Sequence, residues 1–339
     1  MSGLAMIRLR ASIVLLLMAA LLCLPCTVVA RASGDPLPSW NEGHVKRSLV
    51  SFVQRVSDPA SADYMLPSER VAVFDNDGTL WPEQPVYFQL QFAMDRAAEL
   101  ASADPSLASS EPYRGLLSGD PKAVASIGER GVAELMMRTH AGMKTDEFEG
   151  SVRAWMDIAR HPRFGRRYTE LAYVPMIELL SYLRDNDFTV FIVSGGGVDF
   201  MRPWAPKVYG VPESRIIGSS VKAEFLLEED VPVIRKLAEL EFVDDGPGKP
   251  VGIHRFIGKR PVLAVGNSDG DLQMLQWTTI NEGLRLGVIV HHTDADREWA
   301  YDRDSPVGKL DKALDESGAR GWLVVDMARD WSVIFAGDR

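Results

Sequence analysis

Apolar and polar positions alternate along the chain in blocks that predict strands and helices in turn. Residues 40–56 carry apolar side chains at helical spacing, whereas residues 71–74 form a short apolar run that ends in a turn. Residues 83–173 contain several helical stretches and no convincing strand. The expected helices are 40–56, 86–100, 122–137, 147–160, 175–183, 199–204 and 251–256, and the expected strands are 71–74, 188–193, 216–222, 223–227, 261–265, 286–290 and 322–325. Alternation of this kind predicts an α/β fold with a parallel sheet covered by helices.

The N-terminal 32 residues have a different pattern. Arg8 and Arg10 precede an uncharged apolar run at 13–30, and Ala30-Arg31-Ala32 offers the small-x-small pattern of a signal-peptidase site. We therefore expect a signal peptide at 1–32 and a periplasmic or secreted product without a stable membrane partner. The apolar run is also long enough for the alternative, an uncleaved N-terminal anchor.

Cleavage of this segment changes the composition of the chain. Both cysteines, Cys23 and Cys26, lie inside it, so the mature protein would have no thiol nucleophile, no Cys-ligated zinc and no disulfide. Removal of three arginines takes the formal net charge from −10 to −13, and no run rich in Lys and Arg occurs elsewhere. Such acidity argues against nucleic acid as a partner.

Polar residues follow three of the expected strands at the point where each strand ends. These segments are Asp75-Asn76-Asp77-Gly78-Thr79, then Ser194-Gly195-Gly196-Gly197, and then Gly266-Asn267-Ser268-Asp269-Gly270-Asp271. Asp-Gly turns and glycine-rich turns are common when taken singly. Because the carboxyl ends of parallel strands meet at one edge of a sheet, the three together indicate a ligand site there.

These three segments resemble motifs of the haloacid-dehalogenase superfamily of hydrolases, most like its phosphoserine-phosphatase branch, over roughly residues 70–295. The resemblance implies a Rossmann-like core made of residues 33–82 and 174–339. It also implies a helical cap, residues 83–173, inserted after the first motif.

The residue types suit hydrolysis of a phosphate monoester, which needs a nucleophile, a proton for the leaving group and positive charge around the phosphoryl oxygens. The resemblance implies that Asp75 attacks phosphorus and that Asp77 protonates the leaving oxygen. A carboxyl group beside a second carboxylate and a phosphate has a raised pKa and can hold that proton. A leaving halide needs no proton, so Asp77 favours phosphoryl chemistry over carbon–halogen cleavage. The expected phosphate-binding groups are Thr79, Ser194 and the amides of Gly195 and Gly196, at a helix start.

A lysine is expected to neutralise Asp75 and the phosphate together, and two lysines precede the last motif. Lys259 directly precedes the strand at 261–265, at the amino end of the sheet. Lys249 precedes the helix that leads into that strand, and so lies at the carboxyl edge. We therefore expect Lys249 to be the catalytic lysine.

Magnesium is the expected cofactor, because it is a hard ion that prefers carboxylate and water oxygens. The expected site consists of Asp75, Asp77, Asn267 and Asp271. Asn267 departs from the family pattern, which has an aspartate there, and its missing charge predicts a weaker metal site. Asp269 is expected to be a peripheral turn residue, or alternatively to supply the missing carboxylate.

Other polar residues give weaker signals. Glu83 lies near the position where phosphoserine phosphatases have a glutamate that reads the substrate ammonium. Arg130 and Arg138, in the expected cap, offer charge for a substrate carboxylate. His291 and His292 follow a strand, and because neighbours in a strand point to opposite faces they are not expected to share a metal.

The sequence thus predicts an exported, magnesium-dependent phosphomonoesterase that acts on a small phosphorylated metabolite. Two alternatives stay open: a phosphotransferase on the same fold, and a non-catalytic protein that binds a phosphate ligand. The spacing of residues indicates neither the particular substrate, which the cap would select, nor the oligomeric state.

Overall fold

The computed structural model describes residues 34–109 and 140–338 of the 339-residue chain. The expected signal peptide, the expected helix at 122–137, Arg130 and Arg138 lie outside these residues. Pro36–Arg339 forms one unit of structure, distinct from Met1–Asp35. In the described part of the chain, no helix is long and apolar enough to cross a membrane.

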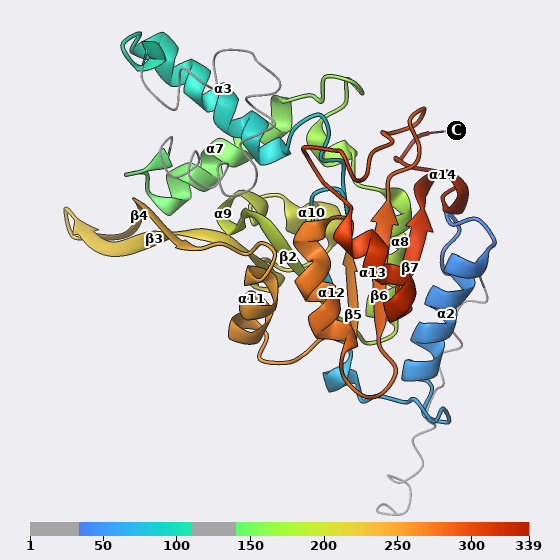
Figure 1. Ribbon diagram of the computed structural model, residues 1–339. Coiled ribbons are helices and arrows are strands. Elements are labelled where there is room, and N and C mark those ends of the chain that lie inside the picture. The colour runs from blue at the N-terminus through green and yellow to red at the C-terminus, as the bar shows by residue number, and fades with distance from the viewer. Residues whose placement is uncertain (1–33, 110–139, 339) are drawn as a thin grey trace, which may run out of the picture. The chain divides into compact units, whose positions relative to one another are not determined.

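Within residues 34–109 and 140–338, seven strands form one sheet in the order β4-β3-β2-β1-β5-β6-β7 (Figure 1). All neighbouring strands run parallel except β3 and β4, which are antiparallel. The expected α/β, Rossmann-like fold is thereby confirmed. The strands are β1 (Val71–Phe74), β2 (Thr189–Gly197), β3 (Ile216–Glu228), β4 (Val231–Phe242), β5 (Leu263–Gly266), β6 (Leu286–His291) and β7 (Leu323–Asp326).

β1 lies between β2 and β5, and its register positions the three motifs. Phe74 is level with Ile192 of β2 and with Val265 of β5. The residues that follow these three positions therefore meet at the carboxyl edge of the sheet. All four residues of β1 are buried, which suits a strand covered by helices on both faces.

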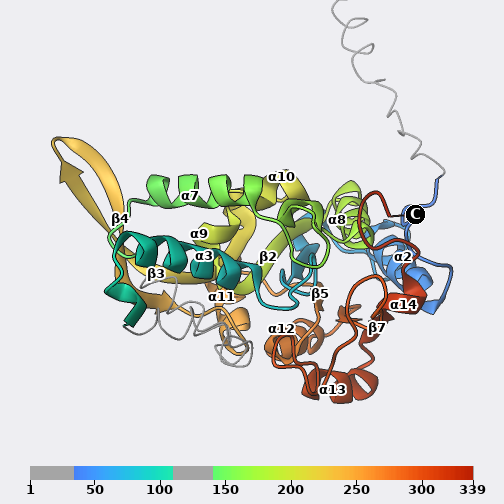
Figure 2. The ribbon, with the colours of Figure 1, turned by 90° about the horizontal axis from the view of Figure 1, so that it is seen from above.

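Helices cover both faces of the sheet, with α11, α12 and α13 on one face and α2 and α8 on the other (Figures 1 and 2). Successive side chains of β1 point alternately to the two faces of the sheet. Ala72 and Phe74 belong to the larger apolar core, together with Leu49 of α2, whereas Val71 and Val73 belong to the smaller core beneath α11 and α12. These helices are α2 (His44–Ser57), α8 (Val174–Asp185), α11 (Gly248–Phe256), α12 (Leu272–Thr279) and α13 (Lys312–Arg320); the short helices α10 (Ala205–Tyr209) and α14 (Met327–Asp330) complete the core.

Two helices, α3 (Phe88–Ala103) and α7 (Thr145–Ile158), belong to the region between β1 and β2 that was expected to form the cap. α7 packs against α9 (Val198–Met201), the short helix that directly follows β2. The chain leaves the core near Leu80 and re-enters it at Tyr173, whose N–H donates to the carbonyl of Leu80 at 2.9 Å. The two connections of this region thus lie side by side.

The structure differs from expectation at β3 and β4. The expected strands at 216–222 and 223–227 are one continuous strand, β3, and a second strand, β4, follows it. The turn between them consists of Glu229 and Asp230, which have φ angles of 50° and 67°. β4 was not predicted because its sequence, VPVIRKLAELEF, has a proline at the second position and mixes charged with apolar residues on a strand that is mostly exposed or half-exposed.

The β3–β4 hairpin reaches the helices of the inserted region (Figures 1 and 2). The N–H of Lys236 in β4 donates to the carbonyl of Met143 at 2.9 Å, and the N–H of Gly142 donates to the carbonyl of Lys236 at 2.9 Å. The hairpin therefore adds main-chain contacts to a region that was expected to be helical throughout.

The packing of the core predicts that truncation of two leucines changes the free energy of unfolding by very different amounts. Leu49 of α2 is 1% exposed, whereas Leu66 is 60% exposed. We expect Leu49→Ala to lower the free energy of unfolding by about 2–5 kcal/mol, because it removes buried methyl groups and leaves a cavity. Leu66→Ala should change it by less than about 0.5 kcal/mol. Urea denaturation followed by tryptophan fluorescence measures both, and equal losses would contradict the packing of α2 on the sheet.

Candidate active site

Asp75 is the first residue after β1 and lies at the centre of the site. Its N–H donates to the carbonyl of Val265 in β5 at 2.9 Å, which fixes its backbone against the neighbouring strand. Its Oδ1 accepts a hydrogen bond from Lys249 Nζ at 2.6 Å, and its Oδ2 lies 3.3 Å from Thr79 Oγ1. The same Lys249 Nζ lies 2.6 Å from Asp271 Oδ1. One ammonium group thus joins the first motif to the fourth.

The two candidate lysines have different surroundings. Lys249, on α11, is 1% exposed and lies at the carboxyl edge of the sheet. Lys259 is exposed and pairs with Glu69 at 2.6 Å, next to the residues that precede β1. The structure therefore brings Lys249, and not Lys259, to Asp75.

Burial changes the acidity of the first-motif carboxyl groups. It raises the pKa of Asp75, the charge of Asp271 acts in the same direction, and Lys249 opposes both. It raises the pKa of Asp77 to about 6, against the effect of the hydrogen bond that Trp81 Nε1 donates to Asp77 Oδ1 at 2.8 Å. A carboxyl group with a pKa near neutrality can both give and take a proton during turnover.

The fourth motif follows β5. Asn267 is 1% exposed; its Oδ1 accepts from Thr79 Oγ1 at 2.9 Å, and its Nδ2 donates to Glu83 Oε1 at 2.7 Å. Asp271 Oδ2 accepts from the N–H groups of Asn267 at 2.9 Å and Ser268 at 3.2 Å. Because its Oδ1 contacts Lys249 Nζ, both oxygens of Asp271 take part in hydrogen bonds. The side chain therefore holds Lys249 and the loop of the fourth motif in position.

Asp269 lies on the far side of the same loop. Its Oδ1 accepts from the N–H groups of Asp311 and Ala313, each at 3.0 Å, where α13 begins. The carboxylate therefore caps the start of α13.

The oxygen atoms around Asp75 suit a hard cation. Asp75 Oδ2 and Asn267 Oδ1 lie 3.3 Å and 2.9 Å from Thr79 Oγ1, so the two oxygens are neighbours around that hydroxyl group. Among the described residues, no group of three or more His, Cys, Asp or Glu side chains is arranged to enclose a metal. Mg²⁺ usually keeps several water ligands and needs few protein oxygens, so this donor set fits it. Lys249 interacts with the carboxyl groups of Asp75, Asp77, Asp244 and Asp271, so several buried acidic groups lie around this one ammonium group.

The second motif extends β2 further than expected. The strand continues through Gly197 and α9 starts at Val198, so the amides of Gly195 and Gly196 lie in a strand extension and not at a helix start. The N–H of Gly196 donates to Ser194 Oγ at 3.0 Å. A Cβ built on Gly196 would lie 3.5 Å from Asp77 Oδ2, so this motif borders the first one. Phosphate binding by Ser194, Gly195 and Gly196 stays a prediction.

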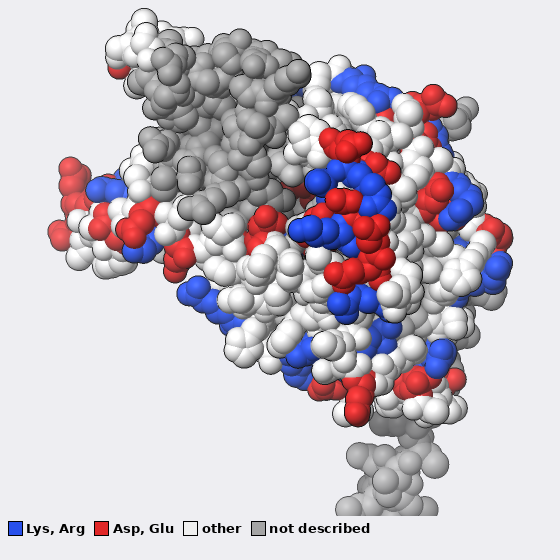
Figure 3. Space-filling view, in the orientation of Figure 1, with Lys and Arg blue, Asp and Glu red and all other residues white. Residues whose placement is uncertain are grey.

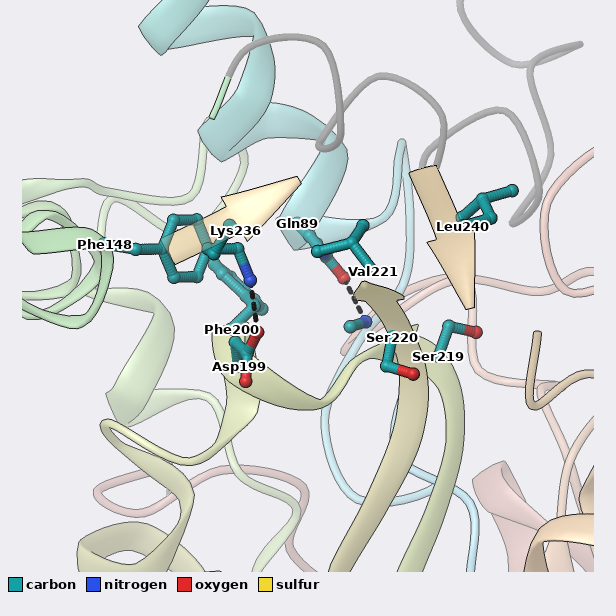
Figure 4. A pocket seen from close by; sticks show the side chains of 10 residues that line it. Gln89, Phe148, Asp199, Phe200, Ser219, Ser220, Val221, Lys236 and Leu240 are labelled. Atoms are coloured by element: carbon teal, nitrogen blue, oxygen red, sulfur yellow. Dashed lines mark hydrogen bonds and ion pairs between the residues drawn. The ribbon is translucent and has the colours of Figure 1, made fainter. Parts of the chain in front are cut away.

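A small cavity of about 30 Å³ lies beside this motif (Figure 4). Gln89 of α3 accepts a hydrogen bond from the N–H of Gly197 at 2.6 Å. Lys236 of β4 forms an ion pair with Asp199, and its Nζ lies 4.6 Å from the centre of the Phe148 ring. The hairpin and the inserted helices therefore both line the approach to the second motif.

Several side chains that sequence reasoning missed or set aside hold the first motif. Trp81 donates a hydrogen bond to Asp77, and its position two residues after the motif could have predicted a contact there.

His292 is 2% exposed, and its Nε2 lies 2.7 Å from the carbonyl oxygen of Gly78. Because a carbonyl oxygen can only accept a hydrogen bond, Nε2 carries a proton. Its Nδ1 lies 3.0 Å from Glu298 Oε2. More than two hundred residues separate His292 from Gly78, and no spacing predicts such a contact.

The structure gives the contacts of Glu83 and His291, which the sequence did not predict. Glu83 lies against Asn267 and Tyr301 and is 2% exposed, and its expected contact with a substrate ammonium stays a prediction. His291 is half-buried, with Nε2 3.4 Å from Asp302 Oδ2. The two histidines thus have different partners.

Charged side chains of both signs are interspersed on the face of the molecule shown in Figure 3. Arg303, for example, pairs with Asp311 at 2.5 Å and with Asp315 at 2.6 Å. Exposed pairs of this kind contribute little to stability.

The fold and the strand-end motifs define a hydrolase of the haloacid-dehalogenase type. Residues 72–276 match the family model described as haloacid dehalogenase-like hydrolase. The chain belongs to the haloacid dehalogenase-like hydrolases.

Solved structures are similar to the chain at low sequence identity. A protein with unknown function from Bordetella pertussis Tohama I is 15% identical, with 76% of this chain and 99% of that chain covered and a TM-score of 0.50. A functionally unknown protein from Anaerococcus prevotii DSM 20548 is 14% identical (77% and 89% covered, TM-score 0.49). A phosphoserine phosphohydrolase-like protein from Francisella tularensis subsp. tularensis SCHU S4 is 15% identical (65% and 87% covered, TM-score 0.39). No curated protein matches the chain.

The bridge made by Lys249 predicts a pH-dependent loss of stability. Lys249→Met leaves Asp75 and Asp271 buried without their shared ammonium, which should lower the free energy of unfolding by about 3–5 kcal/mol near neutral pH. Burial raises the folded-state pKa of Asp75 to about 8 and Lys249 opposes that rise, so removing the ammonium raises this pKa further. Wild type and variant should therefore lose stability in parallel between about pH 4 and pH 8, and the extra loss caused by the substitution should grow above about pH 8, where only the wild type ionises Asp75 in the folded state.

Urea denaturation of the variant and wild type at several pH values measures this effect. Lys259→Met is the matched control, since Lys259 is exposed and its removal should leave the free energy of unfolding nearly unchanged. A loss for Lys249→Met that does not depend on pH would contradict the proposed charge pairing.

Proposed function

We propose that this protein is a magnesium-dependent phosphomonoesterase that acts on a small phosphorylated metabolite through an aspartyl-phosphate intermediate. The observation that carries the proposal is the pairing of two different carboxyl groups on one loop. Burial raises the pKa of both groups, to about 8 for Asp75 and to about 6 for Asp77. Lys249 Nζ, 2.6 Å from Asp75, and a bound cation would favour the ionised form of Asp75, whereas Asp77 accepts a hydrogen bond from the neutral indole of Trp81. The first group therefore suits a nucleophile and the second suits a proton donor.

In the first half of the reaction, a carboxylate oxygen of Asp75 forms a bond to phosphorus while the bond from phosphorus to the leaving oxygen breaks. Asp77 gives its proton to that oxygen, so the product leaves as a neutral alcohol. Lys249 opposes the rise in the pKa of Asp75 and would offset the charge of the incoming phosphate. Bound Mg²⁺, held by Asp75 and Asn267 with Asp77, would supply further positive charge beside the phosphoryl oxygens.

In the second half, Asp77 acts as a base. It accepts a proton from the water that attacks phosphorus, the bond from phosphorus to Asp75 breaks, and inorganic phosphate leaves. Thr79 and Ser194, whose hydroxyl groups border Asp75 and Gly196, would orient the phosphate. Asp75 and the proton on Asp77 are then restored for the next cycle.

We also propose that the enzyme is exported, on the basis of the N-terminal pattern of Arg8, Arg10 and the apolar run at 13–30. Mass spectrometry of the protein recovered from its own cells should find an N-terminus at Ser33 in the periplasmic or secreted fraction. An intact N-terminus in the membrane fraction would instead indicate an anchor.

Two substitutions separate the roles of the aspartates. Asp75→Asn should abolish release of phosphate from p-nitrophenyl phosphate in the presence of magnesium, because an amide cannot form the intermediate. Asp77→Asn should still be phosphorylated by this substrate, since p-nitrophenolate leaves without a proton, but should accumulate phosphoenzyme that mass spectrometry detects. Asp269→Asn, which alters only the cap of α13, should keep wild-type turnover.

Wild-type turnover by Asp75→Asn would refute the covalent mechanism. Activity that persists after EDTA treatment would refute the magnesium requirement. A second alcohol added as acceptor distinguishes hydrolysis from phosphotransfer, because a transferase forms a new ester at the expense of free phosphate.

A further inference from the structure

Glu83 is in direct contact with the amide group of Asn267. Its Oε1 accepts hydrogen bonds from Asn267 Nδ2 and from Tyr301 OH, each at 2.7 Å. Glu83 is 2% exposed and Asn267 is 1% exposed. Both of these donors are neutral, so the hydrogen bonds satisfy the carboxyl oxygen without cancelling a charge on it. Burial raises the pKa of Glu83, so a nearby cation would be needed to favour its ionised form.

The main chain closes around this contact on two sides. A Cβ added at Gly78 would collide with Asn267 Nδ2 and with Glu83 Oε1, and a Cβ added at Gly308 would collide with Glu83 Oε1. Both glycines have positive φ angles, +74° and +65°. The backbone therefore passes at a distance that only glycine allows, and it keeps Glu83 and Asn267 together.

The contact also fixes which atom of Asn267 faces the nucleophile. Because Nδ2 must donate to a carboxylate, Oδ1 takes the other side of the amide, 2.9 Å from Thr79 Oγ1. The same hydroxyl lies 3.3 Å from Asp75 Oδ2. The carbonyl oxygen of Asn267 is therefore directed to the position where Asp75 and a cation would meet.

We propose that Glu83 supplies the negative charge that position 267 lacks, so that Asn267 and Glu83 together replace one ligating aspartate. Asn267 offers the oxygen, and Glu83, through the N–H of that amide, makes the oxygen more electron-rich and adds its own charge to the site. Partners behind a metal ligand commonly act in this way and contribute about 10–100-fold to metal affinity. The inference rests on the proposed magnesium site and assigns to Glu83 a positioning role in it.

Glu83→Gln tests the inference, because it keeps an oxygen for both donors and removes only the charge. The probe is Mg²⁺ alone, titrated into the full chain by isothermal calorimetry, with thermal unfolding measured with and without the ion. We expect Glu83→Gln to bind Mg²⁺ about 10–100-fold more weakly. Its thermal midpoint without Mg²⁺ should not fall, since one of several neighbouring negative charges has been removed. Asp269→Asn is the control in the same loop and should bind as the wild type does.

A double variant provides the decisive comparison. Glu83→Gln combined with Asn267→Asp exchanges the carboxylate and the amide, so one of each stays in contact and the charge moves to position 267. This variant should bind Mg²⁺ with nearly wild-type affinity. It tests the contribution of the Glu83 charge to Mg²⁺ affinity even if Glu83→Gln alone is unstable. Equal binding by Glu83→Gln and the wild type, or a double variant in which binding is lost, would overturn the inference.

Hydrolysis of p-nitrophenyl phosphate by the wild type, assayed in parallel, separates this inference from the proposed function. A wild-type protein that binds Mg²⁺ and leaves the ester intact refutes the phosphatase, while the affinities of the variants still decide the role of Glu83. A wild-type protein that does not bind Mg²⁺ overturns the role of Glu83 itself.

Discussion

The ammonium group of Lys249 lies between two buried carboxylates, 2.6 Å from an oxygen of Asp75 and 2.6 Å from an oxygen of Asp271. Moving carboxylates out of water costs several kcal/mol each, and a shared cation with good hydrogen bonds is what offsets that cost. The two carboxylates follow the adjacent strands β1 and β5, and the lysine comes from the helix that precedes β5. The lysine therefore joins the ends of the two central strands and holds the side chain of Asp75.

Around that contact the site carries more negative than positive charge. Burial raises the pKa of Asp77, of Glu83 and of Asp75, which shows that the protein alone does not fully stabilise their ionised forms. An incoming divalent cation would favour ionisation of all of them. This excess of charge is the physical link between the local structure and phosphoryl chemistry, because the same cation that stabilises the carboxylates would also stabilise a transferring phosphoryl group.

The β3–β4 hairpin shows that the hydrophobic pattern predicts buried strands better than exposed edge strands. β1 and β5 were predictable because a strand buried on both faces is a continuous apolar run. β4 is an edge strand whose side chains are mostly half-exposed or exposed, so its composition is unconstrained by a core and it was missed. The extension of β2 through three glycines was missed for a related reason, since a glycine-rich segment reads as a turn.

The sequence by itself determined the α/β fold, the three motifs at strand ends, and the placement of Lys249 and not Lys259 beside Asp75. These features follow from local runs of residues and from the rule that parallel strands share one carboxyl edge. Only the tertiary structure decided that Glu83 lies against Asn267, that His292 contacts the carbonyl of Gly78, and that Lys236 of the hairpin meets Asp199. The first two contacts join residues about two hundred positions apart, and the third depends on a strand that the sequence did not predict. Residue spacing determines which edge of the sheet a side chain occupies, whereas its partner there depends on how loops and side chains pack.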